Sequence, residues 1–392
     1  MTISAPSRLT LLHARLAVYG LFLIAGISLG TWTSRIPAIK DDLGLSDGEL
    51  SVVLLGIAGG AIIGMQAVGR LIDRYGSRRV MIPAGLLQGV VLVLPAFAPS
   101  LPALAAAMFA FGMVHGVLDV SMNANAVVVE RVYAKPIMSS FHAVFSIGGF
   151  LGAGIGGLFA SAGASVPVTF GSVGLVVTLV ATQCLRWALP DAFDPGRRPV
   201  QEAAAAPGRP MAGWVLFLGV LAFCCLVGEG AAADWSSVYL VEDLRATETV
   251  GAFGYAAFSI MMTAGRLAGD RLTARLGPVL LVRCCGALAG IGLLVTLLIG
   301  HQVAALIGFG LFGAGLSCII PQVFSAAGHR DPAQSGRALA QVASIGYAGL
   351  LAGPVLIGAV AELTGKPIAL AIPAIMALFV AAAAPALRPA RS

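Results

Sequence analysis

Long hydrophobic stretches alternate with short polar breaks along the whole chain. A helix needs about 20 apolar residues to cross a bilayer. Twelve stretches of suitable length are found, at 12–34, 48–69, 79–98, 103–130, 137–161, 167–188, 212–235, 250–272, 279–299, 302–327, 335–361 and 367–387. Turn-forming residues mark the breaks, for example at 99–102 and 364–367. The pattern predicts an all-α integral membrane protein with twelve transmembrane helices.

The longest polar break separates the sixth stretch from the seventh. Residues 191–210 are rich in Pro, Ala, Gly and Arg, a composition typical of a flexible linker. We therefore predict an N-terminal six-helix bundle at 1–190, a cytoplasmic linker at 191–210 and a C-terminal six-helix bundle at 211–392.

Short sequence features recur after about 200 residues, at the same places in the two predicted halves. Trp32 lies at the end of the first stretch, and Trp235 lies at the end of the seventh. The pair Phe111-Gly112 in the fourth stretch likewise corresponds to Phe309-Gly310 in the tenth. Steady offsets indicate a duplication. Two pseudo-symmetric six-helix bundles are expected from it, with a solute site between them near the middle of the membrane.

The composition supports a membrane protein and orients it. The chain is 58% hydrophobic and 11% charged, whereas soluble domains carry about 25% charged residues. With the N-terminus placed in the cytoplasm, 20 of the 24 Arg and Lys residues fall on the cytoplasmic side, and the exceptions are Arg35, Lys40, Arg245 and Lys366. This bias predicts that both termini lie in the cytoplasm. The net charge of +6 thus reflects topology, and a nucleic-acid partner is not expected.

A short basic turn joins the second and third stretches. It reads Gly69-Arg70-Leu71-Ile72-Asp73-Arg74-Tyr75-Gly76-Ser77-Arg78-Arg79 and returns, degraded, at 269–277. Topology alone explains the arginines, but the fixed spacing of Gly69, Asp73 and Gly76 requires a tertiary explanation. We predict that Asp73 accepts hydrogen bonds from Arg side chains and from a helix N-terminus.

Ionisable groups inside a span are costly and by default mark a pathway or coupling site. The fourth stretch is richest in them, and four polar residues share one face of a helix there: His115, Asp119, Asn123 and Glu130. Burial disfavours the charged form of Asp119, which makes this residue the first candidate for proton coupling. The alternative is a structural cluster that holds the fourth helix to a neighbour, and for Glu130 an interfacial salt bridge with Arg131 or Lys135.

Other polar residues within the stretches are further candidates for solute binding. His142 is expected level with Asn123, and a titrating imidazole suits a proton-coupled step, although a packing role is the alternative. Glu229 lies between two glycines that allow a local break and close approach of a solute, with an ion pair to Arg35 as the other interpretation. Hydrogen-bonding candidates are Asn125, Gln322, Gln341 and Tyr347.

Patterns for catalysis and metal binding are not found in the sequence. The six cysteines lie inside apolar runs without ligand spacing, so we expect neither disulfides nor a metal site. The chain shows no nucleophile–base pair and no phosphate-cradling glycine loop with a lysine. We therefore expect neither enzymatic activity nor a cofactor.

The basic turn, Gly-x-Leu-x-Asp-Arg-x-Gly-x-Arg-Arg, resembles the signature between helices two and three of the major facilitator superfamily. The segments 32–40, 123–126 and 141–146 resemble a bacterial subgroup that is distantly similar to fucose-type sugar:proton symporters. The resemblance covers the whole chain. It implies that contacts of the turn lock the cytoplasmic side shut while the other side is open, with these gating residues: Gly69, Asp73, Arg74, Gly76, Arg78 and Arg79.

The resemblance leaves two kinds of coupling open. In the fucose-type symporters, acidic groups on helices one and four carry coupling. This chain has Asp119 on the fourth helix but no acid in the first, so Glu229 is the second candidate. Drug:proton antiporters are the alternative, because Gly148-x-x-x-Gly152 resembles their helix-five signature, whereas Gly112 stands where they carry an arginine. A non-transporting sensor on the same fold is an alternative from another class.

The expected function is secondary active transport of a small polar solute, similar to a sugar or polyol, across a bacterial inner membrane. Alternating access would move the solute, with coupling to protons. The expected partners are the solute, protons and the lipid bilayer, and we expect a monomer.

Overall fold

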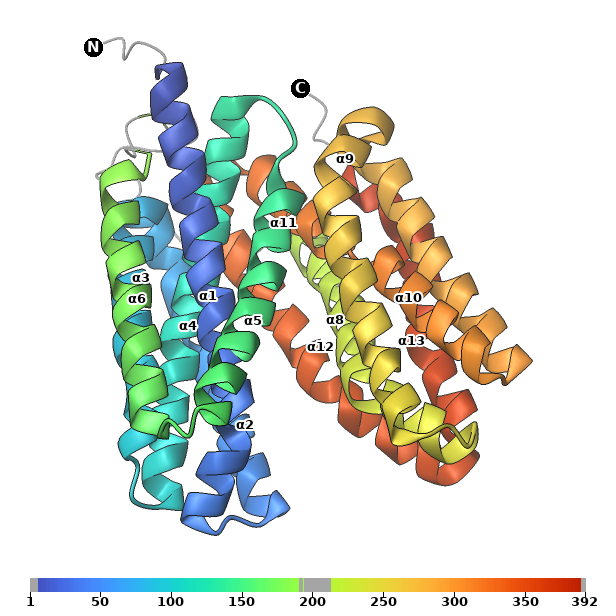
Figure 1. The fold of residues 1–392 in the computed structure, drawn as a ribbon. Helices are drawn as coiled ribbons and strands as arrows, with labels where there is room; N and C mark the ends of the chain where they lie inside the picture. The colour runs from blue at the N-terminus through green and yellow to red at the C-terminus, as the bar shows by residue number, and fades with distance from the viewer. Residues whose placement is uncertain (1–5, 190–192, 194–212, 389–392) are drawn as a thin grey trace. The chain divides into compact units, whose positions relative to one another are not determined.

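The computed structural model describes residues 6–189, 193 and 213–388, and nearly all of the predicted linker lies outside these residues. In this described part the chain forms helices and no strand (Figure 1). The long helices are α1 Arg8–Leu43, α2 Asp47–Tyr75, α3 Ser77–Val93, α4 Leu101–Tyr133, α5 Met138–Ser161, α6 Val166–Trp187, α8 Gly213–Val238, α9 Glu248–Ile299, α10 Gln302–Leu316, α11 Ile319–Arg330, α12 Ser335–Thr364 and α13 Lys366–Ala383. Shorter turns are 3₁₀-helical at Leu94–Phe97, Pro332–Gln334 and Ala384–Leu387 and π-helical at Tyr239–Asp243.

Eleven helical segments of the described chain are long and apolar enough to cross a membrane. One of them, α9, has 52 residues, and a straight helix of that length would extend about 78 Å, more than twice the hydrocarbon core of a bilayer. It changes direction at Gly277, whose φ of 73° and ψ of 162° are not helical. Two predicted stretches, 250–272 and 279–299, therefore lie in α9, one on each side of this glycine.

The tenth predicted stretch, 302–327, lies in one membrane-length helical segment, Gln302–Arg330. A turn at Ser317 and Cys318 divides this segment into α10 and α11. Pro321 gives a physical reason, because it has no N–H to donate to the carbonyl four residues earlier, that of Ser317. A break inside an apolar span leaves backbone polar groups that neighbouring helices must satisfy.

Glycines bring helices into backbone contact in both repeats. A Cβ added at Gly60 of α2 would meet the carbonyl oxygen of Phe109 in α4, and one added at Gly313 of α10 would meet that of Phe258 in α9. Small residues allow such close approach, which drives helix packing in lipid.

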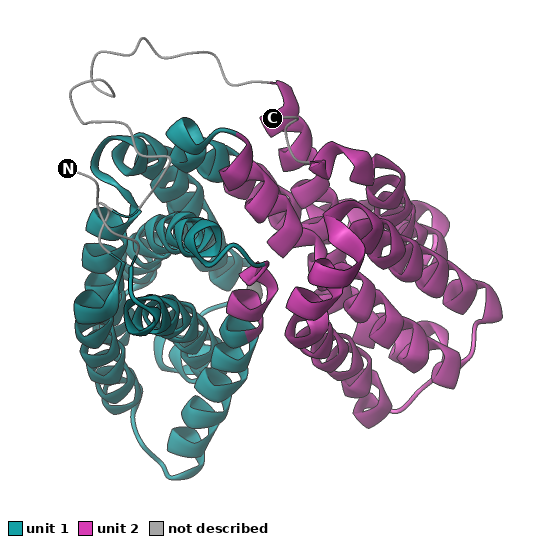
Figure 2. Ribbon diagram, turned by 90° about the horizontal axis from the view of Figure 1, so that it is seen from above, with its two compact units in different colours: residues 1–135, 144–210, 331–341 teal, residues 136–143, 211–330, 342–392 magenta. Residues whose placement is uncertain are grey.

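Two compact units are found (Figure 2). Unit 1 comprises residues 1–135, 144–210 and 331–341, and unit 2 comprises residues 136–143, 211–330 and 342–392. The first turns of α5 therefore belong to unit 2, and the first turns of α12 belong to unit 1. These units differ from the predicted halves in those two segments, and the division at the linker stays a prediction.

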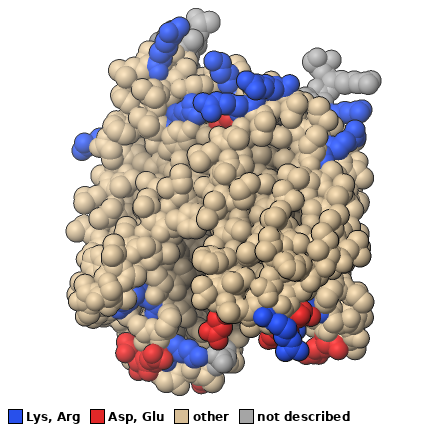
Figure 3. Space-filling model, turned by 45° about the vertical axis from the view of Figure 1, so that its right-hand side comes forward, with Lys and Arg blue, Asp and Glu red and all other residues tan. Residues whose placement is uncertain are grey.

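Charged side chains lie mainly at the ends of the helices. On the face shown in Figure 3, a wide band of uncharged residues separates the charged side chains at the two ends. This distribution fits helices whose middle parts lie in lipid, because charges there are costly.

Candidate functional site

Asp73, near the end of α2, contacts the beginning of α12 within unit 1. Its Oδ1 accepts a hydrogen bond of 2.8 Å from the backbone N–H of Gly336. Its Oδ2 lies 3.5 Å from Nε of Arg337. A carboxylate at a helix N-terminus is favoured by the free N–H groups and the helix dipole. Asp73 thus accepts the predicted hydrogen bond from a helix N-terminus, while its contact with an arginine is an ion pair without a hydrogen bond. Its gating role stays a prediction.

The two glycines of the basic turn have separate structural reasons. A Cβ at Gly69 would lie 3.0 Å from Cα of Arg337 and 2.9 Å from Cβ of Ala340, so the absent side chain lets α12 approach α2. Gly76 has a φ of 91°, a conformation that residues with a Cβ rarely adopt. The spacing of the motif is therefore set by one helix contact and one turn.

The arginines of the turn have different environments. Arg78 donates from Nη2 to the carbonyl of Leu185, 3.1 Å away, near the end of α6, where a cation is favoured by the helix dipole. The guanidinium of Arg74 lies over the ring of Tyr75, and both Arg74 and Arg79 are exposed.

The degraded copy of the turn makes a similar contact within unit 2, which our sequence analysis missed. Asp270 Oδ1 accepts a hydrogen bond of 3.1 Å from the backbone N–H of Ser140, in the first turn of α5. A Cβ at Gly269 would meet the side chain of Ser139, and Gly277 has a positive φ of 73°. The glycine followed by an acid at 269–270 was the signal that could have revealed this cap.

Three predicted residues of α4 lie one turn apart, as their spacing requires. Asn123 Nδ2 donates to the carbonyl and to Oδ1 of Asp119, at 2.9 and 3.2 Å. His115 is buried and its ring stacks on Phe111, 5.9 Å between centroids. Asp119 itself is half-buried. Within the described residues no Lys or Arg pairs with Asp119, and its carboxylate accepts a hydrogen bond from an amide of its own helix.

Two other polar residues of α4 have buried positions. Asn125 is buried, and its Nδ2 donates to Oγ of Ser77 in α3 at 3.0 Å. This contact uses Asn125 for helix packing. Glu130 is also buried.

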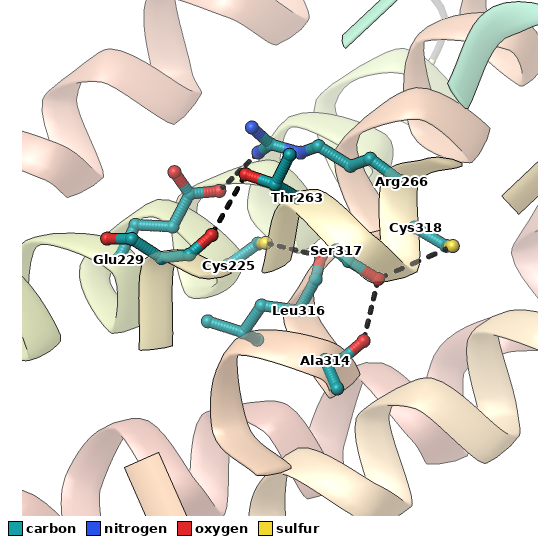
Figure 4. Close-up of polar contacts among 9 residues, drawn as sticks. Cys225, Glu229, Thr263, Arg266, Ala314, Leu316, Ser317 and Cys318 are labelled. Carbon is teal, nitrogen blue, oxygen red and sulfur yellow. Dashed lines mark hydrogen bonds and ion pairs between the residues drawn. The ribbon is translucent and has the colours of Figure 1, made fainter. Parts of the chain in front are cut away.

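A buried ion pair joins α8 and α9 in unit 2 (Figure 4). Arg266 Nη2 lies 3.3 Å from Oε1 of Glu229, and the side chains are 8% and 21% exposed. Arg266 therefore lies inside a membrane-spanning helix, and counting it among the cytoplasmic loop charges was wrong. Arg35, the partner of Glu229 in the alternative interpretation, donates to the carbonyl of Ala164 at 2.8 Å.

The helix break between α10 and α11 lies beside this pair (Figure 4). Cys225, one turn before Glu229 in α8, donates its thiol to the carbonyl of Leu316 over 3.8 Å. The thiol of Cys318 contacts the carbonyl of Gly265, next to Arg266, at 3.6 Å. Both thiols thus contact backbone carbonyls close to the turn between α10 and α11.

The glycines around Glu229 pack helices and do not break α8, which corrects the expected local break. The helix runs uninterrupted from Gly213 to Val238. A Cβ at Gly228 would meet Leu316 and Phe312 at 2.9 Å, and one at Gly230 would meet the carbonyl of Leu350 at 3.1 Å.

The remaining predicted residues are distributed over both units. Gln322 Nε2 donates to Thr273 Oγ1 at 2.9 Å, and both residues are buried. His142 is buried with its ring 5.9 Å from that of Phe324. Gln341, in unit 1, and Tyr347, in unit 2, are half-buried.

The cysteines of the described chain are free thiols, and no group of three or more His, Cys, Asp or Glu side chains there could hold a metal ion.

Comparisons with known proteins place this fold and these sites in a family. The Major Facilitator Superfamily model matches residues 18–333 and 235–392. An uncharacterized MFS-type transporter of Yersinia pestis is 34% identical over 367 residues, covering 93% of each chain. An uncharacterized transporter of Sinorhizobium fredii is 36% identical over 371 residues, 94% of this chain and 96% of the relative.

Solved structures show the same fold. FucP, a major facilitator transporter, in its outward conformation matches with a TM-score of 0.79 and 16% identity, over 96% of this chain and 98% of FucP. The family and these relatives are transporters and not enzymes. The chain therefore belongs to the major facilitator superfamily, and it is an all-α membrane transporter.

Proposed function

We propose that the protein is a proton-coupled symporter of a small polar solute, similar to a sugar or polyol, in a bacterial inner membrane. The observation that carries the proposal is the polar column of α4, in which His115, Asp119 and Asn123 follow one another at intervals of one turn. A half-buried carboxylate supported by an amide can take up a proton without leaving a buried cation unpaired.

The solute would bind to neutral hydrogen-bonding groups inside the membrane-spanning helices. Amide and imidazole groups both donate and accept hydrogen bonds, as the hydroxyl groups of a sugar require. The candidates are His115, Asn123, Gln341, His142, Gln322 and Tyr347, with the carboxylates of Asp119 and Glu229. The E. coli fucose:proton symporter FucP, which shares the fold, has a solute of this chemical kind.

Gating would use the basic turn. Asp73 holds the N-terminus of α12 through Gly336 and Arg337. In an alternating-access cycle this contact would stabilise one state and open in the other. The bacterial relatives support an inner-membrane location, and the positive-inside bias supports cytoplasmic termini.

Drug efflux receives less support from the structure. The antiporter-like glycines of α5 have a packing explanation, because Cβ atoms at Gly148 and Gly152 would meet the carbonyl oxygens of Leu23 and Ile27 in α1. These glycines therefore do not require an efflux function.

The test begins with a thermal-shift screen of the purified protein against sugars, polyols, amino acids and cationic dyes, because a ligand of the native state raises apparent stability. The radiolabelled hit is then assayed for counterflow and for accumulation under a pH gradient in proteoliposomes. We expect a polar hit that shows both. Binding without counterflow would indicate a sensor, and accumulation of a cationic dye with the opposite proton gradient would indicate an efflux antiporter.

A further inference from the structure

We propose that Arg266 binds a carboxylate of the transported solute in exchange for Glu229, so that the solute is a hydroxylated carboxylic acid, such as a sugar acid. This inference rests on the proposed transport function and narrows its solute class. It assigns to Arg266 the binding of a solute carboxylate.

The first argument is the environment of the cation. Arg266 is 8% exposed within a span, and its ion-pair partner at 3.3 Å is Glu229. Removing one member of a buried ion pair leaves an uncompensated charge, which is strongly destabilising. Arg266 is thus paired with a carboxylate in the folded protein, and a guanidinium matches a carboxylate in geometry.

The second argument is access. The side chain of Glu229 is 21% exposed although the residue lies in the middle of α8. A carboxylate in a span avoids lipid. The exposed part of Glu229 is therefore where we infer that a proton and a small solute reach the pair, whereas a fully enclosed ion pair would admit neither.

The third argument is the supply of hydroxyl groups beside the pair. Thr263 lies one turn from Arg266 in α9, and its hydroxyl donates to the carbonyl of Ser259 (Figure 4). Ser317, at the helix break, donates to the carbonyl of Ala314. Each hydroxyl oxygen keeps lone pairs that can accept from hydroxyl groups of a solute.

The exchange conserves charge. The proton goes to the carboxylate of Glu229, which leaves Arg266, and the carboxylate of the solute takes its place, so the guanidinium keeps one anion. A neutral sugar offers no replacement anion and leaves the ion pair closed. One proton thus accompanies each solute carboxylate at this pair. Other titratable groups around Arg266 are His142 of α5, Cys225 of α8, Cys318 at the break and Asp270, one turn further along α9.

Binding to the full-length protein in detergent tests the inference with matched probes. Gluconate, glucuronate and galacturonate are compared with glucitol, glucose and galactose, by thermal shift and calorimetry. We expect at least one acid to bind about 100-fold more tightly than its neutral partner. Its affinity should rise about tenfold for each unit that the pH falls while Glu229 is ionised.

Variants identify the residues. Arg266→Gln should abolish binding of the acid, whereas Glu229→Gln should bind it at least as tightly and lose the pH dependence. Where Arg266→Gln alone does not fold, the double variant Arg266→Gln with Glu229→Gln removes both charges and keeps the site neutral. Equal binding of acid and neutral partner, binding of the acid by an Arg266 variant, or binding of none of the acids would overturn the inference.

Counterflow separates this inference from the proposed function. If a neutral sugar is exchanged by wild-type protein and by Glu229→Gln alike, transport stands and the carboxylate inference fails. If gluconate binds through Arg266 but shows no counterflow, the binding inference stands and transport of that solute fails.

Discussion

The two repeats keep an acid in the middle of a span but surround it differently. Asp119 in unit 1 is supported by the amide of Asn123 in the same unbroken helix. Glu229 in unit 2 is paired with the guanidinium of Arg266 from another helix, beside a broken one. Protonation of Asp119 breaks no ion pair of the described residues, whereas protonation of Glu229 weakens its ion pair with Arg266. We infer that the duplicated halves use their acids differently.

The largest expected effect comes from removing the charge of Asp119. Asp119→Asn should abolish accumulation driven by a pH gradient while it spares downhill exchange, because exchange needs no net proton movement. The measurement is uptake and counterflow of the same solute in proteoliposomes.

The competing interpretation, that Asp119 only holds helices together, predicts loss of folding or equal loss of both activities. If Asp119→Asn accumulates solute at the wild-type level, the coupling role must be assigned to Glu229, and the inferred difference between the two acids is wrong.

Helix packing in the two repeats should be equally sensitive to added side chains, although the surroundings of Asp119 and Glu229 differ. Gly60→Ala and Gly313→Ala each place a Cβ against a backbone carbonyl, so we expect a loss of about 1–3 kcal/mol or more in stability. Gly59 is the matched control, because nothing lies within 4 Å of a Cβ added there. Gly59→Ala should change stability by less than about 1 kcal/mol. Thermal denaturation in detergent measures both, and equal effects at Gly59 and Gly60 would contradict the packing argument.

The cap of α12 gives a smaller effect that leaves folding intact. Asp73→Asn removes the charge that Gly336 and Arg337 contact, and hydrogen bonds to charged groups contribute about 1.5–3 kcal/mol. We expect uptake to fall about tenfold at equal membrane abundance. Arg70→Gln changes a neighbouring, exposed charge outside the predicted gating residues and should transport almost normally. Wild-type uptake by Asp73→Asn would exclude the proposed gate.

Orientation is tested by reporter fusions. Fusions after Lys40 and Arg245 should report the periplasm, and fusions after Arg79 and Arg198 the cytoplasm. The basic bias toward one side motivates this expectation, and Arg266 must now be left out of that count. An inversion at any of the four sites would overturn the topology.

The sequence predicted what depends on local pattern. Apolar length locates the spans because each must cross the same hydrocarbon thickness. The column of α4 follows from helical periodicity. Pairing between helices does not follow from local pattern, so the sequence did not predict Arg266 as the partner of Glu229. The signal was present, since Arg266 lies inside the predicted stretch 250–272. Pro321 was likewise a signal for the turn before α11, although hydrophobicity alone does not indicate a turn in this stretch.

The smallest expected effect concerns the break itself, which distinguishes unit 2 from the unbroken α4. The thiol of Cys225 donates to the carbonyl of Leu316, at the end of α10. Cys225→Ala should leave that carbonyl without this donor and cost about 1 kcal/mol of stability, whereas Cys225→Ser keeps a donor and should cost less. Cys224→Ala, at the adjacent buried thiol, controls for lost volume. Thermal denaturation of the three variants decides the point. If Cys225→Ala and Cys224→Ala are equally stable, the thiol does not support the break, and the broken helix must be held by packing around Gly265 and Ser317 alone.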